Sequence, residues 1–378
     1  MSSPRPIVYQ LNLSPSLGGA EVYTAFFARA LLACGWPTEV VVAREAEFWR
    51  RLDCGGAKLS PFVGNEQLLA AFPAGAIVVV HSPAPEPLIR RLAQSTRLLA
   101  LCHQALYSVA QPNYYRHAEL LIPVSHYAVE TLRRRGYRNI YSAPLYGLGQ
   151  VAGNGEGRVV RGDLVDWDGR KARDRLLAGI DTLLARFRPT VRYVKRQGLT
   201  LGIVSRLAGL KQFPELLRHI APQLAARPGV WLEVFGRAVG YRALRDFRQA
   251  AAPLGARVRY WGHQQDVLPV YRSIDFLLTG LPERESLGLN VIEAQMCGTP
   301  VLAPAAPPFT ETVIDGGGGF LYRDPRQDGG ADFGRVLDLA LTPGARPDLR
   351  QQREHLAQFE FPAFRNRVDL LMKTVCGE

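Results

Sequence analysis

The stretch DFLLTGLPERESLGLNVIEAQMCGTPVLAP, residues 275–304, contains one complete strand–loop–helix–strand unit. Its apolar runs at 275–280 and 299–304 are continuous rather than alternating, which is typical of strands buried on both faces of a parallel sheet. Between them, the loop LPERES leads into a helix that we expect to begin near Gly288 and Leu289. The unit predicts a parallel sheet covered by helices, and it places two carboxylates, Glu285 and Glu293, at the front of one helix.

Apolar strands alternate with helical patterns through almost the whole chain. In the first half we expect strands at 7–12, 38–43, 76–82, 97–103, 120–125 and 139–144, with helices that include 20–34 and 126–136. In the second half we expect strands at 199–207, 230–236, 257–262, 275–280, 299–304 and 318–322. Two successive α/β sheets of this kind predict two doubly wound domains.

The segment between the two predicted sheets, 147–198, is atypical. It begins Gly-rich (GLGQVAGNGEG), becomes charged, and continues as an amphipathic helix pattern at 176–187. GLGQVAG is not followed by an apolar helix, so we interpret it as a hinge rather than a dinucleotide fingerprint. We therefore expect an N-terminal domain at 1–198 with 147–198 as its linker or insert, a C-terminal domain at 199–345, and C-terminal helices at 346–378 that pack across the domain junction.

Charge and composition limit the possible partners. The 378 residues have a net charge of +12; residues 1–200 contain 25 Lys and Arg against 15 Asp and Glu, and residues 201–378 contain 21 against 19. A basic first half suits nucleic acid, an anionic membrane surface or a phosphorylated substrate, although a solubilising charged surface also explains it.

The cysteine spacing and the lack of long apolar runs predict the compartment and the metal content. The five cysteines lack the spacing of a zinc site or a disulfide framework, so we expect free thiols and no metal. The N-terminus MSSPRPIVYQLNL has no secretory pattern, and no apolar run approaches the roughly 18 residues of a membrane span. These patterns predict a cytoplasmic protein.

Three polar clusters follow predicted strands. Gly18 and Gly19 come after the first strand and open a helix, a setting that favours an anion but also fits an ordinary tight turn. In the second half, Arg206 follows a strand and Lys211 begins the next helix, where open α/β sheets bind ligands. An exposed pair of cations is the more usual explanation of that spacing, and helix-start electrostatics explain either Glu285 or Glu293 taken alone.

The longer stretch ERESLGLNVIEAQMCGTPVLAPAAPPFTETVIDGGGGFL, residues 283–321, resembles the donor-site signature of GT-B glycosyltransferases of retaining family 4, the glycosyl transferases group 1. That signature has E-x7-E inside E-G-F-G-L-x-x-x-E-A, followed by G-x-P-V. The positions in step with it are Glu285, Gly288, Leu289, Glu293, Ala294, Gly298, Pro300, Val301, Glu311 and Gly319. The resemblance continues through VSRLAGLK, GHQQDVLPVYRSIDFLLTG, GGAE, ALCHQ and LIPVSHYAVETLRRRGY, and so covers most of the chain.

The resemblance implies a GT-B fold, with two facing Rossmann-like domains, a cleft between them and C-terminal helices crossing over. Arg206 and Lys211 would clamp the diphosphate of a nucleotide sugar, Glu285 would hold the donor sugar, and Glu293 the ribose. His103 matches the front-domain histidine near the transferring sugar, so the implied catalytic set is His103, Arg206, Lys211 and Glu285. The remaining implied donor-binding residues are Gly18, Gly19, Ser205, Gly236, His263, Val267, Ser286, Leu287, Gly288 and Leu289.

The chain also departs from the family pattern. Gln212 stands where a glycine is usual after the lysine, and Ser286 and Leu287 replace the glycine and aromatic of E-G-F-G-L. The sequence YGLG at 146–149 replaces N-G-V-D, and the segment 150–198 is longer than usual. The last two differences affect the linker and the acceptor side rather than the donor side.

The resemblance predicts a retaining transfer from a UDP- or GDP-sugar to a lipid-linked or cell-surface glycan acceptor, with no metal or other cofactor. A GT-B epimerase is the alternative, and a nucleic-acid-binding protein is a weaker one because interleaved aromatics are lacking. A pyridoxal-phosphate phosphorylase would need a Schiff-base lysine, for which the sequence offers no candidate context. We further expect the basic N-terminal domain to contact an anionic inner membrane leaflet as a peripheral protein.

Overall fold

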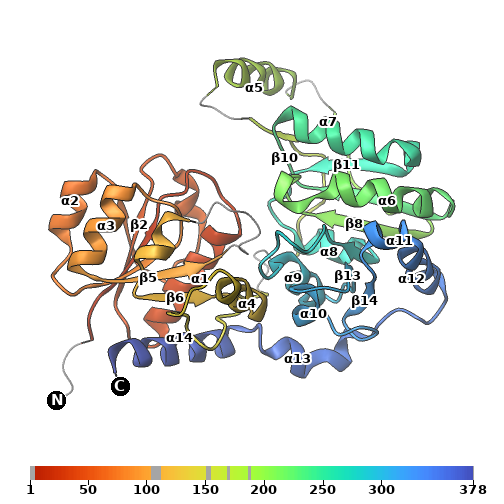
Figure 1. The fold of residues 1–378 in the computed structure, drawn as a ribbon. Coiled ribbons are helices and arrows are strands. Elements are labelled where there is room, and N and C mark those ends of the chain that lie inside the picture. The colour runs from red at the N-terminus through yellow and green to blue at the C-terminus, as the bar shows by residue number, and fades with distance from the viewer. Residues whose placement is uncertain (1–4, 104–111, 150–154, 168–170, 186–188, 378) are drawn as a thin grey trace. The chain divides into compact units, whose positions relative to one another are not determined.

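The computed structural model describes residues 5–103, 112–149, 155–167, 171–185 and 189–377. It divides into two compact units, Met1–Leu148 with Ala357–Glu378, and Gly149–Leu356 (Figure 1). We expected the first domain to extend to residue 198, but the segment after Leu148 belongs with the second unit. The reason is a set of backbone hydrogen bonds: Gly162 N donates to Trp261 O at 2.7 Å, and His263 N donates to Asp163 O at 3.0 Å.

The first unit contains a parallel sheet in the order β3-β2-β1-β4-β5-β6. Its strands are β1 (Val8–Asn12), β2 (Thr38–Val42), β3 (Lys58–Pro61), β4 (Ile77–Val80), β5 (Arg97–Cys102) and β6 (Leu120–Pro123). Its helices are α1 (Gly19–Ala33), α2 (Asn65–Ala71), α3 (Glu86–Ser95), α4 (His126–Arg134) and α14 (Phe361–Cys376). The order reverses between β1 and β4, so the carboxyl ends of these two strands flank a switch point, where open sheets bind ligands.

Two details of this sheet differ from the sequence prediction. The edge strand β3 was not expected, because KLSP has only one apolar side chain and ends in proline. The expected strand at 139–144 is reduced to a single bridge between Leu121 and Ile140. The other five strands are confirmed, and all four residues of β4 are buried, as the continuous Val/Ile pattern predicts.

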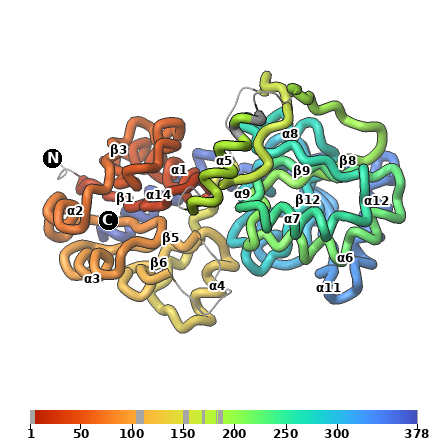
Figure 2. The backbone as a smooth tube through the Cα atoms, turned by 90° about the horizontal axis from the view of Figure 1, so that it is seen from above, coloured from red at the N-terminus to blue at the C-terminus, as the bar shows by residue number. Residues whose placement is uncertain are grey.

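The C-terminal helix α14 returns to the first unit and lies beside α1 (Figure 2). The ring of Phe364 meets that of Tyr23 edge to face, with centroids 5.5 Å apart. At the next turn of the helix, Trp36 Nε1 donates to Asp369 Oδ1 at 3.4 Å. Phe364 is fully buried, so the last helix contributes directly to the core of a domain that begins more than 300 residues earlier.

The second unit contains a parallel sheet in the order β11-β9-β8-β12-β13-β14. Its strands are β8 (Leu199–Val204), β9 (Val230–Phe235), β11 (Val258–Gly262), β12 (Phe276–Leu278), β13 (Val301–Pro304) and β14 (Gly319–Tyr322), all six as predicted. Its helices are α6 (Phe213–Ala225), α7 (Gly240–Ala251), α8 (Leu268–Ser273), α9 (Leu289–Met296), α10 (Phe309–Thr312), α11 (Pro325–Asp328), α12 (Ala331–Leu341) and α13 (Arg353–Ala357). The switch point lies between β8 and β12.

The segment that precedes β8 adds two elements to the second unit. Strand β7 (Val165–Asp166) pairs in parallel with β10 (Ala238–Val239). Helix α5 (Ala172–Ala185) lies over the amphipathic pattern expected at 176–187 but begins four residues earlier, and residues 186 and 187 lie outside the described residues.

Replacing Phe364 by Ala should destabilise the first unit by about 3–5 kcal/mol, because the change removes a fully buried ring from the contact between α14 and α1. Leu370→Ala on the same helix is the matched control, since Leu370 is 57% exposed and its truncation should cost less than about 0.5 kcal/mol. Denaturant unfolding of the full chain measures both. Equal effects of the two changes would contradict the assignment of α14 to this core.

Candidate functional site

The carboxyl ends of β8 and β12 bring two loops of the second unit into contact. The chain leaves β8 at Val204 and turns through Gly209–Lys211 into α6, while the chain from β12 passes Gly280 into the loop 281–288. A Cβ atom at Gly280 would lie 2.0 Å from the carbonyl oxygen of Lys211. Only glycine permits this approach, and it sets Lys211 directly beside the loop that contains Glu285.

Lys211 and Glu285 form an ion pair between these two loops, with Lys211 Nζ donating to Glu285 Oε2. Their side chains are 30% and 17% exposed, so the pair is partly shielded from water and remains reachable. The two residues are 74 positions apart in the sequence. The structure therefore brings together two residues that the sequence predicted separately: Lys211 as a ligand of the diphosphate and Glu285 as a ligand of the donor sugar.

Glu293 lies on the second turn of α9, and its carboxylate is held by a tyrosine. Tyr271 on α8 donates its hydroxyl hydrogen to Glu293 Oε2 at 2.8 Å. Burial raises the pKa of Glu293, while the hydrogen bond from Tyr271 and the charge of Lys211 act in the opposite direction with less effect. Burial, together with the adjacent Glu293 carboxylate, also raises the pKa of Tyr271 well above its ordinary value, so its hydroxyl stays a donor.

The start of α9 faces this cluster without a side-chain cap among the described residues. Gly288 occupies the N-cap position with φ +77°, a left-handed conformation that suits glycine. Asn290, in the first turn, donates from Nδ2 to Val204 O at 3.2 Å and so fixes the helix start to the end of β8. The first N–H groups of α9, which have no partner within the helix, lie where an anion is favoured.

The loop before α9 is largely buried. Ser286 is 5% exposed and Leu287 4% exposed, and the hydroxyl oxygen of Ser286 has no hydrogen-bond partner in the described part of the chain. Leu287 therefore fills core volume where the family pattern has an aromatic. Ser286, by contrast, has an unused hydrogen-bonding group next to Glu285.

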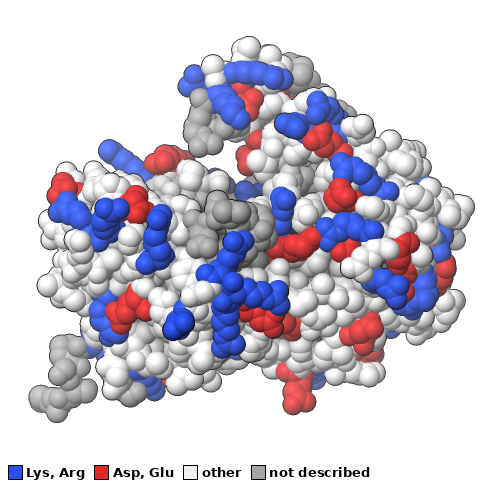
Figure 3. Space-filling view, in the orientation of Figure 1, with Lys and Arg blue, Asp and Glu red and all other residues white. Residues whose placement is uncertain are grey.

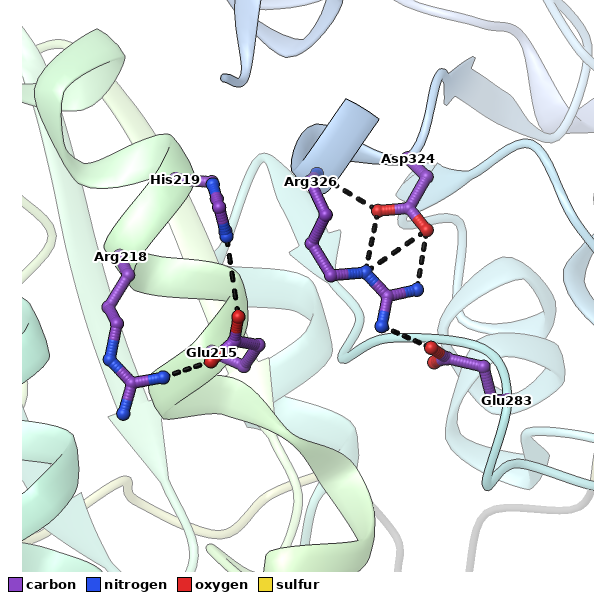
Figure 4. A network of polar contacts seen from close by, with 6 residues as sticks. All are labelled: Glu215, Arg218, His219, Glu283, Asp324 and Arg326. Atoms are coloured by element: carbon purple, nitrogen blue, oxygen red, sulfur yellow. Dashed lines mark hydrogen bonds and ion pairs between the residues drawn. The ribbon is translucent and has the colours of Figure 1, made fainter. Parts of the chain in front are cut away.

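An arginine from α11 fixes the entrance of this loop (Figure 4). Arg326 donates to Asp324 from Nε at 2.9 Å and from Nη2 at 2.5 Å, and its remaining nitrogen pairs with Glu283. Glu215 on α6, in the same view, pairs with Arg218 and His219. The bidentate geometry holds the guanidinium rigidly, so the Glu283 end of the loop has a defined position before any ligand binds.

Gln212, immediately after Lys211, has a left-handed backbone with φ 52° and ψ 25°. It is the only residue other than glycine with a positive φ among the described residues. The family pattern has glycine at this position, and the structure gives the reason, since the turn between Lys211 and α6 requires that conformation. A non-glycine residue there costs about 1–2 kcal/mol, which the surrounding structure must offset.

Arg206, Ser205 and Gly236 lie at the ends of β8 and β9. Ser205 N donates to Phe235 O at 3.0 Å, and Gly236 N donates to Gly262 O at 2.7 Å, so the three strand ends are tied together. The side chain of Arg206 is exposed, and no ion pair or side-chain hydrogen bond to it is present in the described ranges. It is therefore a cation available at the same edge of the sheet as Lys211.

His263 and Val267 lie after β11, at the far edge of the same sheet. His263 is exposed and its backbone N–H donates to Asp163 O of the preceding segment, while Val267 caps α8. Although the residue as a whole is exposed, partial desolvation of its ring lowers the pKa of His263, and the charge of Arg237 lowers it further. Asp163 also pairs with Arg237 Nη2 at 2.9 Å. The segment that the sequence suggested was a linker thus contacts the loop of His263, which we expected to bind the donor.

His103 lies in the first unit, at the end of β5, and forms a pair with a second histidine at the end of β4. His103 Nε2 and His81 Nδ1 are 3.3 Å apart, and their rings stack with centroids at 5.5 Å. Burial lowers the pKa of His103 to about 3 and that of His81 well below its ordinary value, so both rings are neutral near pH 7. The residues that follow His103, 104–111, lie outside the described residues.

Gly18 and Gly19 form the start of α1 in the first unit, as N-cap and first residue. Glu21, one turn in, is 5% exposed. Burial raises its pKa, and hydrogen bonds from its own backbone and that of Gly18 lower it by less. This helix start therefore already has a buried carboxyl group of its own chain beside it.

Three residues of these clusters were missed by the sequence analysis: Tyr271, Arg326 and His81. His81 directly follows the apolar run VVV at 78–80. Its place at a strand end was the one signal that could have identified it. No group of His, Cys, Asp or Glu that could hold a metal ion occurs within the described ranges. In the same part of the chain, no helix combines the length and the apolar character that crossing a membrane requires.

Glu293→Gln should raise the free energy of unfolding at neutral pH. The pKa of Glu293 is higher in the folded than in the unfolded state. The free energy of unfolding of the wild type therefore falls as the pH rises above the unfolded pKa of about 4.3. Glutamine does not titrate and still accepts the Tyr271 hydrogen bond. The stability gain should be largest at pH 7 and vanish below about pH 4, where both states of the wild type are protonated. Denaturant unfolding at several pH values measures this, and a pH-independent difference would contradict it.

Residues 198–332 match the family model for Glycosyl transferases group 1. A D-inositol 3-phosphate glycosyltransferase from Geodermatophilus obscurus is 34% identical over 220 residues, covering 52% of this chain and 47% of the relative. The enzyme of the same name from Saccharomonospora viridis is 32% identical over 213 residues, covering 51% and 47%. The match thus spans about half the length of these curated relatives.

Solved structures match over nearly the whole chain. The structure of Anabaena HepE in complex with UDP and glucose has a TM-score of 0.70 at 16% identity, covering 97% of this chain and 99% of that chain. The pneumococcal O-GlcNAc transferase GtfA, in complex with UDP and GlcNAc, has a TM-score of 0.67 at 12% identity, covering 99% and 100%. At these identities the likeness establishes the fold, and it confirms the architecture that the signature at 283–321 predicts. The chain has the GT-B fold, and its residues 198–332 match the family model for Glycosyl transferases group 1.

Proposed function

We propose that this protein transfers a sugar from a nucleoside diphosphate sugar to an acceptor hydroxyl, with retention at the anomeric carbon. The observation that carries the proposal is the meeting of Lys211, Glu285 and the Glu293–Tyr271 pair at the uncapped start of α9. Such a reaction must stabilise a departing nucleoside diphosphate. Lys211, the exposed Arg206 and the N–H groups of α9 together provide positive potential fixed in place before the reaction begins.

Glu285 changes partner in this mechanism. Without a ligand, its carboxylate neutralises Lys211. When a diphosphate occupies the site, Lys211 pairs with phosphate oxygens, and the freed carboxylate of Glu285 accepts hydrogen bonds from hydroxyls of the donor sugar. Because the ion pair holds both side chains in place beforehand, little conformational entropy is lost when the donor binds.

Glu293 suits a different task, because it stays in place. Tyr271 occupies its Oε2 atom, and the second oxygen is left to accept hydrogen bonds from vicinal hydroxyls such as those of ribose. Burial disfavours the ionised form of this carboxyl, and hydrogen bonds from such hydroxyls would stabilise that form when the ligand binds.

The comparisons support a UDP-sugar as donor, because HepE and GtfA are described in complex with UDP. The curated relatives are named for D-inositol 3-phosphate, a phosphorylated hydroxyl compound, whereas for this protein we propose a lipid-linked or cell-surface glycan precursor as the acceptor. No protein nucleophile, metal or other cofactor has a role in this proposal. The departing phosphate oxygen takes the proton of the acceptor.

Lys211→Ala should weaken UDP binding tenfold or more, at least about 1.4 kcal/mol, because it removes the cation from the diphosphate. Glu293→Gln should selectively reduce the preference of the protein for UDP over 2′-deoxy-UDP, because that preference comes from the ribose hydroxyl. Calorimetric titration measures both ligands, with Lys58→Ala as control, since Lys58 is an exposed lysine of the first unit.

The reaction itself is tested by incubating the protein with UDP- and GDP-sugars and sugar-lipid acceptors, and by assigning the anomer of the product by NMR. An inverted product would contradict the proposed retention. Conversion of the donor to its epimer in the absence of acceptor would show that the protein is an epimerase rather than a glycosyltransferase. Wild-type UDP affinity in Lys211→Ala would contradict the assignment of the diphosphate site.

A further inference from the structure

Helix α5 in the second unit presents apolar side chains to solvent. Leu176 is 67% exposed, Ile180 46% and Leu183 56%. At 3.6 residues per turn these three side chains lie within about 60° of one another and form one continuous stripe. The partly buried side chains of the helix face other directions: Asp174, Leu177, Ala178 and Asp181. The helix therefore exposes a stripe of three aliphatic side chains, while both of its aspartates are partly buried.

Basic side chains border this stripe. Arg173 and Arg175 are exposed, and helical geometry places them about 60° and 100° to either side of Leu176, whereas Asp174 and Asp181 lie on the opposite side. Lys and Arg side chains lie along α5 in the space-filling view (Figure 3). The stripe is therefore bordered by positive charge and separated from the negative charges of the helix.

The surrounding segment is also the most basic part of the first half of the chain. Residues 149–198 contain 11 Lys and Arg against 6 Asp and Glu, a net charge of +5, which is half of the excess of +10 found in residues 1–200. The basic bias that suggested a membrane contact through the N-terminal domain thus lies to a large extent in a segment that belongs to the second unit. Val194, 69% exposed, adds a further apolar side chain to it.

We infer that α5 is an interfacial helix that binds the surface of a membrane containing anionic lipid. Leu176, Ile180 and Leu183 enter the boundary between head groups and acyl chains, and Arg173 and Arg175 extend along the surface to the lipid phosphates. A helix of 14 residues is too short to cross a bilayer but long enough to lie along its surface.

The composition of the stripe favours a lipid surface over a protein partner. Its members are three aliphatic side chains, with none of the Trp or Tyr anchors that dominate protein interfaces. Binding through three aliphatic side chains alone is weak, so the flanking arginines are required and attachment is reversible and sensitive to salt. This inference does not depend on the proposed transfer reaction, because vesicle binding requires neither donor nor acceptor.

Sedimentation with vesicles tests the inference on the full chain. With vesicles of phosphatidylcholine containing about 30% phosphatidylglycerol at low salt, the wild type should pellet, and it should be released as the ionic strength approaches about 0.5 M. Replacing Leu176, Ile180 and Leu183 together by Ser should lower the partition coefficient at least tenfold. Arg173→Gln with Arg175→Gln should lower binding to these vesicles and leave the weak binding to pure phosphatidylcholine unchanged.

Matched controls separate these effects from general surface changes. Leu370→Ser alters an apolar side chain that is 57% exposed on α14, and Arg242→Gln alters a guanidinium on α7 whose side chain is 86% exposed; both should bind as the wild type does. Ile180→Trp provides a direct readout, because insertion should shift its fluorescence to shorter wavelength. Denaturant unfolding of each variant shows that the fold is intact, and a separate UDP titration keeps a failure here distinct from a failure of the proposed function.

Wild-type pelleting of the triple Ser variant would overturn the inference, as would equal binding to neutral and anionic vesicles. The inference would also be overturned if the protein does not bind vesicles but forms a concentration-dependent dimer in sedimentation velocity, and the triple Ser variant does not form that dimer. In that case the stripe would be the contact between two copies of the chain.

Discussion

The ion pair between Lys211 and Glu285 holds the candidate site together, because it joins the loops that follow two neighbouring strands at the switch point of the second sheet. Its geometry depends on Gly280, which lets the two loops touch, and on the left-handed turn at Gln212, which directs Lys211 toward the loop of Glu285. The pair costs desolvation and returns a modest Coulomb gain, so as a source of stability it is weak. As a preorganised pair of opposite charges it is well suited to a ligand that combines phosphates with hydroxyls.

The residues around this pair also include features that destabilise the fold but suit a binding site. Burial penalises the ionised form of the Glu293 carboxyl and so raises its pKa, and the hydrogen bond from Tyr271 only partly offsets that penalty. Ser286 has a buried hydroxyl without a partner among the described residues, and Gln212 has a strained backbone. Such features cluster at binding sites, where a ligand supplies the missing partners. The Arg326 contacts to Asp324 and Glu283 supply rigidity from outside the cluster.

Much of this architecture follows from the sequence, because strands buried on both faces must be continuously apolar. All six strands of the second sheet were predictable for that reason. The edge strand β3 was not, since its half-exposed KLSP has no such pattern, and the expected strand at 139–144 makes only one bridge. Glu285, Glu293 and Lys211 could be named from their motif. Tyr271 and Arg326 could not, because their roles arise from contacts across the fold that no local pattern encodes, and the boundary at Leu148 depends on equally distant hydrogen bonds to β11.

The exchange of partners at Lys211 is the central claim, and UDP binding to Glu285→Gln tests it most directly. Removing the carboxylate frees Lys211 and removes a negative charge that competes with phosphate, so the variant should bind UDP as tightly as the wild type or more tightly. Its turnover of the UDP-sugar should nevertheless fall at least tenfold, because the sugar hydroxyls lose their acceptor. A loss of UDP affinity comparable to that of Lys211→Ala would contradict the account, because Glu285 would then support the diphosphate site rather than compete for its lysine.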